Sequence, residues 1–157
     1  MPEIHAARRR RAQQLVREAD ADAALITARP NVRYLTGLAS SNAALLLPAD
    51  GDAVLATDFR YIGAAQRDAP DVGLLTERFI EPALAAEASR RGITRLAFEA
   101  HEMTVERHAE LAAAARGVNL RHGATLAGQP GPAGRAVGGL RPLLAVIRRG
   151  RGSSRCP

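Results

Sequence analysis

The chain has 157 residues, a formal net charge of +6 and a pI near 11, which at first sight suggests a nucleic-acid-binding protein. The distribution of charge argues against this for most of the chain. Residues 1–116 carry 15 arginines and all 16 acidic residues, whereas residues 117–157 carry seven arginines and no acidic residue. There is no apolar run long enough to span a membrane and no secretion signal, and the single cysteine excludes an internal disulfide, so we expect a cytoplasmic protein.

The first predicted element is a helix over residues 4–19. Its apolar residues recur at helical spacing and form one stripe, made of Ala12, Leu15, Val16 and Ala19. The arginine run Arg8–Arg11 falls opposite that stripe. The simplest interpretation of this run is a solvated helix face, with its field diluted by acidic residues nearby.

Short apolar runs separated by turn signals follow this helix, and we interpret them as strands. They are residues 23–27, 42–47, 53–57, 72–76 and 95–99. The dipeptide Asp50-Gly51 between the second and third runs is a strong signal for a hairpin. Continuous apolar runs are typical of strands that are buried on both faces of a sheet.

Helical patterns alternate with these strands. One helix is predicted over residues 59–69, after an N-capping Asp58, and another over residues 80–91. A third is predicted over residues 105–116, with four side chains expected to point inward: Val105, Ala109, Ala112 and Ala115. Residues 117–121 fit a last edge strand. The alternation predicts an α/β fold with a mixed, mainly buried sheet of about five or six strands and helices on both faces.

Beyond Gly117 the pattern fails, since residues 117–157 contain nine of the 14 glycines and four of the nine prolines. We therefore expect a folded domain over residues 1–121 and a disordered tail rich in Arg, Gly and Pro over residues 122–157. The run LLAVI, residues 143–147, is nevertheless apolar enough to adhere to another surface.

The segment HEMTVERH, residues 101–108, superficially resembles a zinc-binding helix. Val105 stands where such a motif needs its second histidine, so we predict no metal site there. His108 lies among charged residues, and we expect it to be solvated. No serine lies in a nucleophile elbow, and no phosphate-binding glycine loop is present.

Two stretches place an arginine and a tyrosine at junctions between loops and regular elements, where α/β domains tend to bind ligands. In NVRYLTG, Tyr34 is expected in a turn ahead of Gly37, and in TDFRYIG, Arg60 and Tyr61 open a helix. Two interpretations stay open from the residues alone. The groups contact a ligand, or Arg60 pairs with Asp58 while the tyrosine rings rest on the sheet.

Four motifs occur in order along the chain: NVRYLTG, SNAALL, TDFRY and LAFEAH. Over about residues 7–121 the sequence resembles the N-terminal, creatinase-like domain of Xaa-Pro aminopeptidases and Xaa-Pro dipeptidases (prolidases). The resemblance implies a domain that helps to assemble dimers or tetramers and closes one side of a substrate site. It also implies that the chemistry belongs to a separate C-terminal domain. There two Asp, one His and two Glu hold two metal ions, usually manganese, which activate a water.

By the same resemblance, Arg60 is the residue that faces the N-terminal side of a substrate. Tyr61, Tyr34 and Asn42 are further substrate-facing candidates. Phe59 departs from the glycine that is commoner between the Asp and Arg of this motif.

The tail departs from the family, because residues 117–157 contain no carboxylate side chain to bind metal. We expect no catalytic residue, metal or cofactor in this chain, and no peptidase activity from it alone. All 22 basic residues are arginine, which indicates a GC-rich gene, and a frameshift before the catalytic domain would explain the tail.

Two alternative functions stay open. One is an interaction module that forms a homodimer or pairs with a full-length relative. The other is weak, non-specific nucleic-acid binding by the tail; specific binding is not expected, because the tail has no aromatic residue.

Overall fold

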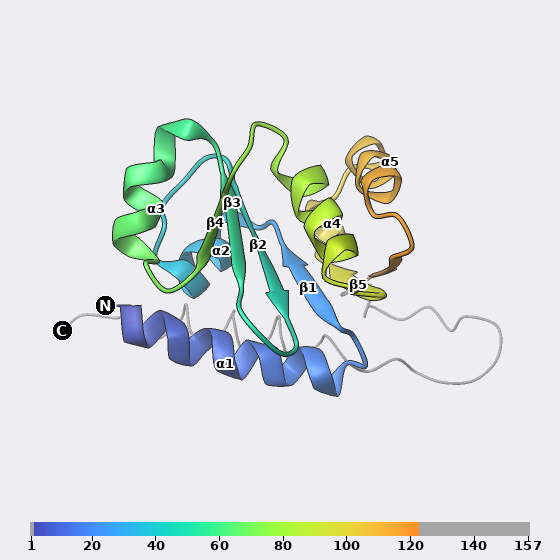
Figure 1. Ribbon diagram of the computed structural model, residues 1–157, viewed down its shortest axis with the longest axis horizontal. Coiled ribbons are helices and arrows are strands. Elements are labelled where there is room, and N and C mark those ends of the chain that lie inside the picture. Colours follow the sequence, from blue (N-terminus) through green and yellow to red (C-terminus); the bar gives the residue numbers. More distant parts are fainter. Residues whose placement is uncertain (1, 123–157) are drawn as a thin grey trace.

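The structure is a computed structural model that describes residues 2–122, and Figure 1 shows these residues as one mixed sheet with helices packed against it. The sheet has six strands in the order β4-β3-β2-β1-β5-β6. This confirms the predicted fold class. The expected tail, apart from residue 122 at the end of β6, lies outside the described residues.

The centre of the sheet is formed by the most apolar runs of the sequence. Strands β1 (Ala23–Ile26), β2 (Ala43–Pro48) and β3 (Val54–Thr57) are buried along their whole length. The pairs β1–β2 and β2–β3 are antiparallel. The predicted hairpin joins β2 to β3, and Gly51 adopts a φ of +93° in its turn, a conformation that glycine tolerates without strain.

Parallel pairs complete the sheet on both sides. Strand β5 (Arg95–Phe98) pairs with β1, and β6 (Asn119–His122) pairs with β5 at one edge, as the sequence predicted for a last edge strand. Strand β4 (Gly73–Thr76) pairs with β3 at the other edge. Because β1, β3, β4, β5 and β6 run in one direction, their carboxyl ends share one side of the sheet, which we call the carboxyl edge.

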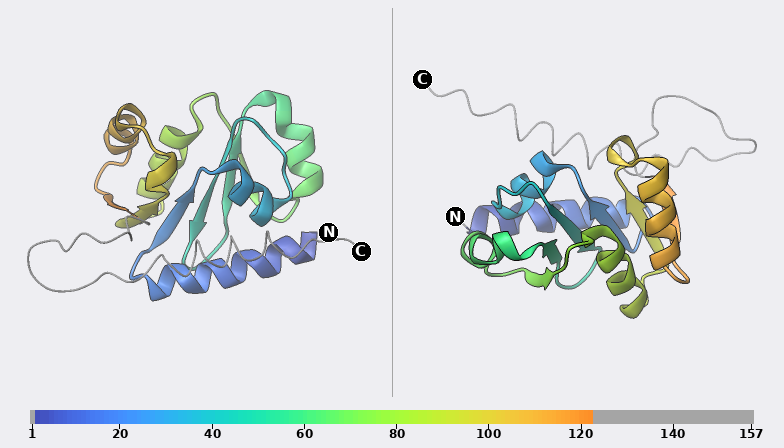
Figure 2. Two further views of the ribbon diagram at one scale, coloured as in Figure 1. Left: turned by 180° about the vertical axis from the view of Figure 1, so that it is seen from behind. Right: turned by 90° about the horizontal axis from the view of Figure 1, so that it is seen from above.

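Two apolar layers cover the two faces of the sheet. Helices α1 (Pro2–Glu18), α2 (Arg29–Thr36) and α3 (Ile62–Asp68) contribute to one, and α4 (Ile80–Arg90) and α5 (Val105–Ala114) to the other. Viewed from above in Figure 2, α1 and α2 lie on one side of the strands and α4 on the other. The predicted apolar stripe of the first helix is buried. No helix among residues 2–122 is long and apolar enough to cross a membrane.

The turn expected around Tyr34 is instead helix α2. Pro30 stands in its first turn, where a missing N–H costs nothing, and Gly37 ends it with a φ of +84°. Asn31, Val32 and Leu35 are buried on its inner face. With only eight residues, the helix offers too few apolar positions for its period to stand out in the sequence.

The inward face predicted for the last helix is wrong, since Val105, Ala109 and Ala112 are exposed and only Ala115 is buried. The buried position within α5 is Leu111. His108 was also wrongly expected to be solvated. It lies half-buried on this inner face with its ring 5.3 Å from that of Phe98. In an alanine-rich helix almost every face is apolar, so packing and not periodicity decides which one turns inward.

The arginine run on α1 is only partly the solvated face that the sequence suggested. Arg10 and Arg11 are exposed, but Arg9 is buried. The guanidinium of Arg9 donates to the carbonyl of Leu35 at 2.7 Å and forms an ion pair with Asp71. Burial lowers the pKa of Arg9, and its pairing with Asp71 opposes that shift.

Candidate functional site

The carboxyl edge brings together most of the residues predicted to face a substrate. Asn42 immediately precedes β2, and Asp58 immediately follows β3. Because the two strands are antiparallel, with Ala43 opposite Thr57, these two residues become neighbours. Asp58 then caps the short 3₁₀ helix η1 (Phe59–Tyr61), which leads into α3.

Asp58 is the centre of this site. Its carboxylate accepts hydrogen bonds from the backbone N–H of Arg60 at 3.0 Å and from Asn42 Nδ2 at 3.0 Å. It also accepts from Arg60 Nε at 2.9 Å and Nη2 at 2.7 Å, a two-pronged contact that fixes the plane of the guanidinium. Hydrogen bonding to Arg60, above all, lowers the pKa of Asp58, and the same contact raises the pKa of Arg60.

The side chain of Asp58 is only 9% exposed, whereas that of Arg60 is 56% exposed. The buried carboxylate therefore holds an arginine that still reaches solvent. Both outer nitrogens keep N–H groups that are not needed for Asp58, and these can donate to a carbonyl or carboxylate of a ligand. The arrangement can bind and orient a polar group.

Tyr61 lies on the same site. Its hydroxyl shares a 2.9 Å hydrogen bond with Ser41 Oγ, and its ring centre is 5.3 Å from the guanidinium carbon of Arg60. Hydrogen bonds with Ser41 lower the pKa of Tyr61. Ser41 directly precedes Asn42, so the SNAALL and TDFRY motifs meet here.

Tyr34 does not join this group, because its contacts are with α1. The guanidinium carbon of Arg8 lies 4.1 Å from the centre of its ring. The Tyr34 carbonyl accepts from Arg8 Nη1 at 3.0 Å and lies 2.9 Å from His5 Nδ1. Its position is therefore explained by the packing of α2 against α1.

The same edge carries exposed apolar side chains that the sequence did not predict as a group. Among residues 2–122, four large apolar side chains are exposed. Phe59 at 77%, Phe79 at 70% and Val105 at 90% follow the carboxyl ends of β3, β4 and β5, while Ile4 lies on α1. Exposed aromatic residues beside arginines are typical of protein interfaces.

A second polar network was missed, although its residues lie within recognised motifs. The buried carboxylate of Glu99 accepts from the backbone N–H groups of Thr27 and Ala28 at 2.7 Å each, and from Asn31 Nδ2. Glu99 follows β5 and so satisfies the start of α2 from the neighbouring strand. Asn31 Oδ1 and Thr27 Oγ1 are buried without a hydrogen-bond partner. Asn31 lies in the NVRYLTG motif and Glu99 in the LAFEAH motif. Their presence in two of the four family motifs is the sequence signal that could have indicated this network.

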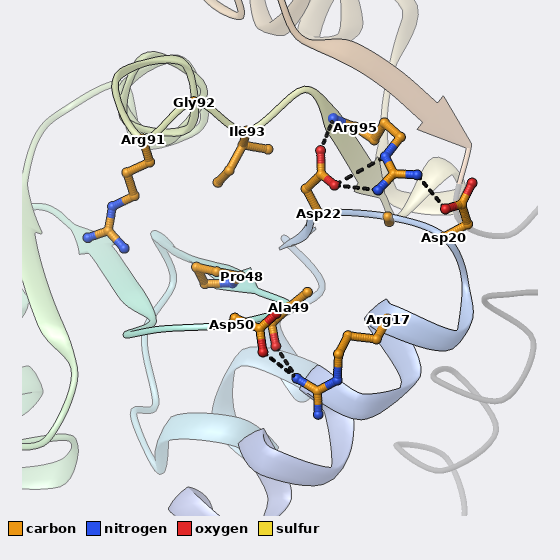
Figure 3. A pocket seen from close by; sticks show the side chains of 11 residues that line it. Arg17, Asp20, Asp22, Pro48, Ala49, Asp50, Arg91, Gly92, Ile93 and Arg95 are labelled. Carbon is orange, nitrogen blue, oxygen red and sulfur yellow. Dashed lines mark hydrogen bonds and ion pairs between the residues drawn. The ribbon is translucent and has the colours of Figure 1, made fainter.

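The opposite end of the sheet, which we call the amino edge, holds a cavity of about 390 Å³, shown in Figure 3. Asp22 accepts from Arg95 Nη2 at 2.6 Å and from Thr94 Oγ1 at 2.7 Å. On the other side of the cavity, Arg17 donates to Asp50 at 3.0 Å. The charges that line the cavity are largely paired with one another, so we interpret this region as structural.

Metal binding was assessed from the donor side chains. Within residues 2–122, no three His, Cys, Asp or Glu side chains converge in an arrangement that could hold a metal ion. The described residues therefore do not fit the two-metal centre that the resemblance associates with the catalytic domain of the family.

Comparison with known proteins places these motifs in context. Residues 8–127 match the Creatinase/Prolidase N-terminal domain family. The N-terminal domain of the cytoplasmic peptidase PepQ from Mycobacterium tuberculosis H37Rv is 41% identical, with a TM-score of 0.72 over 74% of this chain and 92% of that one. The N-terminal creatinase/prolidase-like domain of a protein described as a metallopeptidase from Corynebacterium diphtheriae is 33% identical. Its TM-score is 0.67 over 76% of this chain and 95% of that one.

A longer protein shares the fold. The Xaa-Pro dipeptidase from Bacillus anthracis is 22% identical with a TM-score of 0.68, over 76% of this chain but only 34% of that one. At this identity the similarity concerns the fold alone. Comparison with curated protein sequences found no match.

Proposed function

This chain belongs to the Creatinase/Prolidase N-terminal domain family of Xaa-Pro peptidases, and we propose from that premise that it is a non-catalytic domain that closes one side of a peptidase substrate site. The observation that carries the proposal is the exposed guanidinium of Arg60, held in a fixed plane by buried Asp58. The substrate class is a peptide with proline in its second position.

Arg60 has the right character for orienting a peptide. Asp58 balances its charge, so the pair attracts a ligand weakly at long range and contributes chiefly through directed hydrogen bonds. The acceptor would be a carbonyl or carboxylate near the substrate's N-terminal residue. Asn42 supports this role indirectly, because it donates to the carboxylate of Asp58. The ring of Tyr61 limits the movement of the Arg60 guanidinium on one side.

Tyr34 is the weakest of the four substrate-facing proposals. Its ring lies against Arg8, and its carbonyl is bound to the same arginine. Its contribution to a substrate site would be indirect, through the position of α2.

The partner that completes the site would dock against the carboxyl edge. Phe59, Phe79 and Val105 expose apolar surface there, on the side of the sheet that also presents Arg60. Truncation of exposed aromatic and arginine residues commonly causes the largest losses of interface affinity. The partner would be a metal-binding catalytic domain, supplied by a full-length relative or by a second subunit.

We also propose a cytoplasmic location, since the similar M. tuberculosis protein is described as a cytoplasmic peptidase.

Peptidase assays test the non-catalytic part of the proposal. The purified chain is expected to release no N-terminal residue from Xaa-Pro peptides, with or without added manganese, because the described residues gather no metal ligands. Turnover well above a metal-free blank would contradict this.

A chimeric enzyme tests the role of Arg60. Residues 1–121 would replace the N-terminal domain of an intact Xaa-Pro dipeptidase, and kcat/KM would be measured. Arg60→Gln is expected to lower kcat/KM by roughly 10- to 100-fold, the usual effect of losing a hydrogen bond to a charged group. Arg67→Gln is the matched control, since Arg67 is exposed near the far end of α3 and pairs with its neighbour Asp68. Equal activities of the two variants would refute the assignment.

A further inference from the structure

Ser41 lies in the connection between α2 and β2, residues 37–42, next to the site formed by Asp58 and Arg60. The residue is exposed, yet its hydroxyl Oγ lies 2.9 Å from the hydroxyl oxygen of Tyr61. Its backbone N–H donates to the same oxygen at 3.4 Å. Two polar groups of one residue therefore converge on the hydroxyl of Tyr61.

The connection is held in place on both sides of Ser41. The backbone N–H of Asn42 donates to Ser40 Oγ at 3.0 Å, and its carbonyl accepts from Thr57 Oγ1 at 2.7 Å. The side chain of Asn42 donates to Asp58 at 3.0 Å. Thr57 is a buried residue of β3, so these bonds tie the connection to the sheet. The backbone of Ser41 is therefore fixed although the residue is exposed.

The contacts of Ser41 determine what the Tyr61 hydroxyl can still do. A tyrosine hydroxyl accepts hydrogen bonds and donates one proton. The backbone N–H of Ser41 can only donate, so it uses an acceptor position of the Tyr61 oxygen. If the hydroxyl of Ser41 donates as well, the proton of Tyr61 stays available for another acceptor.

The electrostatics of the site support this direction of the hydrogen bond. Hydrogen bonds from the side chain and then the backbone of Ser41 lower the pKa of Tyr61, and the charge of Arg60 acts in the same sense. Burial and the charge of Asp58 oppose the shift. A tyrosine that donated its proton to Ser41 would instead hold that proton more firmly.

Tyr61 lies close enough to Arg60 for both to contact one ligand. The centre of the Tyr61 ring is 5.3 Å from the guanidinium carbon of Arg60, and an extended dipeptide spans about 7 Å. Asp58 fixes the plane of the guanidinium, as described above. Ser41 stands in the corresponding relation to the hydroxyl of Tyr61.

We propose that Ser41 is a positioning residue, which donates to the hydroxyl of Tyr61 and thereby directs the hydroxyl proton of Tyr61 to an acceptor on the substrate. The acceptor is a second carbonyl or carboxylate oxygen of the peptide that Arg60 binds. This inference rests on the proposed function, because the role of Arg60 is its starting point. It adds a residue that acts through Tyr61 and does not contact the substrate.

Titration of the tyrosine absorbance of the full chain tests the direction of the hydrogen bond. The chain has two tyrosines and no tryptophan, so Tyr34→Phe leaves Tyr61 as the only source of this signal. The pKa of Tyr61 is expected to lie below the ordinary tyrosine value of about 10. All basic residues are arginines, which stay charged throughout this titration, so the ion pairs of the fold persist.

Variants of Ser41 in the Tyr34→Phe background complete the test. Ser41→Ala should raise the pKa of Tyr61, whereas Ser41→Thr keeps a hydroxyl and should leave this pKa low. Ser89→Ala is the matched control, because the hydroxyl that it removes donates to Ala85 in the other apolar layer. Equal effects of Ser41→Ala and Ser89→Ala would overturn the proposal. A lower pKa in Ser41→Ala would also overturn it, since Tyr61 would then be the donor.

The chimeric enzyme separates this inference from the proposed function. Tyr61→Phe is expected to lower kcat/KM by about two- to tenfold, the usual effect of losing a neutral hydrogen bond. Ser41→Ala should lower it by no more than that, and should cause no further loss when combined with Tyr61→Phe. Additive losses would reject this inference alone. Equal activities of Arg60→Gln and Arg67→Gln would reject both proposals.

Discussion

Each end of the sheet holds an aspartate bound by an arginine, and the two pairs differ in what they connect. At the amino edge Asp22 binds Arg95, 73 residues further along the chain. At the carboxyl edge Asp58 binds Arg60, two residues away. Hydrogen bonding to the arginine lowers the pKa of both aspartates. The same aspartate–arginine pair therefore joins distant segments at the amino edge and orients a nearby guanidinium at the carboxyl edge.

The remaining partners sharpen this difference. Asp22 also accepts from the backbone N–H groups of Thr94 and Arg95, so it ties the start of β1 to the start of β5. Arg95 additionally pairs with Asp20, which leaves its guanidinium occupied. Within residues 2–122, Arg60 has no such second carboxylate, and its side chain stays half exposed. A charged pair that joins distant segments stabilises the fold, whereas a pair within one turn leaves a group available for binding.

The largest effect on the free energy of unfolding is expected from Asp22→Ala. It removes an acceptor from two backbone donors and from Arg95 at once, and should lower the free energy of unfolding by about 2 kcal/mol. Urea denaturation measures this loss. Asp52→Ala, at an exposed position of the β2–β3 turn, should change it by less than about 0.5 kcal/mol. A loss no larger than that of the control would contradict the structural role of Asp22.

A smaller effect concerns acid stability. Because the folded pKa values of Asp22 and Asp58 lie below the ordinary value of about 3.9, the unfolded chain binds more protons in acid. The stabilisation from both groups is complete above that ordinary value and is lost as the pH falls toward the folded values. Asp22→Asn should therefore flatten the fall in urea midpoint between about pH 6 and about pH 3. An unchanged slope would show that Asp22 does not contribute.

The smallest effect on stability is expected from Arg60→Gln. The polar contacts of Arg60 within residues 2–122 are with Asp58, in its own turn, and its side chain is 56% exposed, so the urea midpoint should stay close to that of the unmodified chain. This result, together with a large loss of activity in the chimeric enzyme, would separate a binding group from a structural one. A shift of the urea midpoint as large as that of Asp22→Ala would instead show that Arg60 stabilises the fold.

Strand positions were accessible from the sequence because each run is short, apolar and bounded by turn residues. Runs 23–27 and 53–57 became β1 and β3 within one residue at each end. The capping role of Asp58 was equally local and was predicted correctly. From the residues alone, pairing of Asp58 with Arg60 and contact of Arg60 with a ligand are alternatives. The structure shows that the pairing leaves Arg60 exposed and compatible with such contact.

The sequence by itself determined the alternating elements, the hairpin and the family motifs, since each depends on residues close together in the chain. Only the tertiary structure decided that Arg9 is buried, that Glu99 supports the start of α2, and that Tyr34 lies apart from Arg60. Those outcomes depend on contacts between residues about 26 to 71 positions apart, where burial and pairing outweigh local preference.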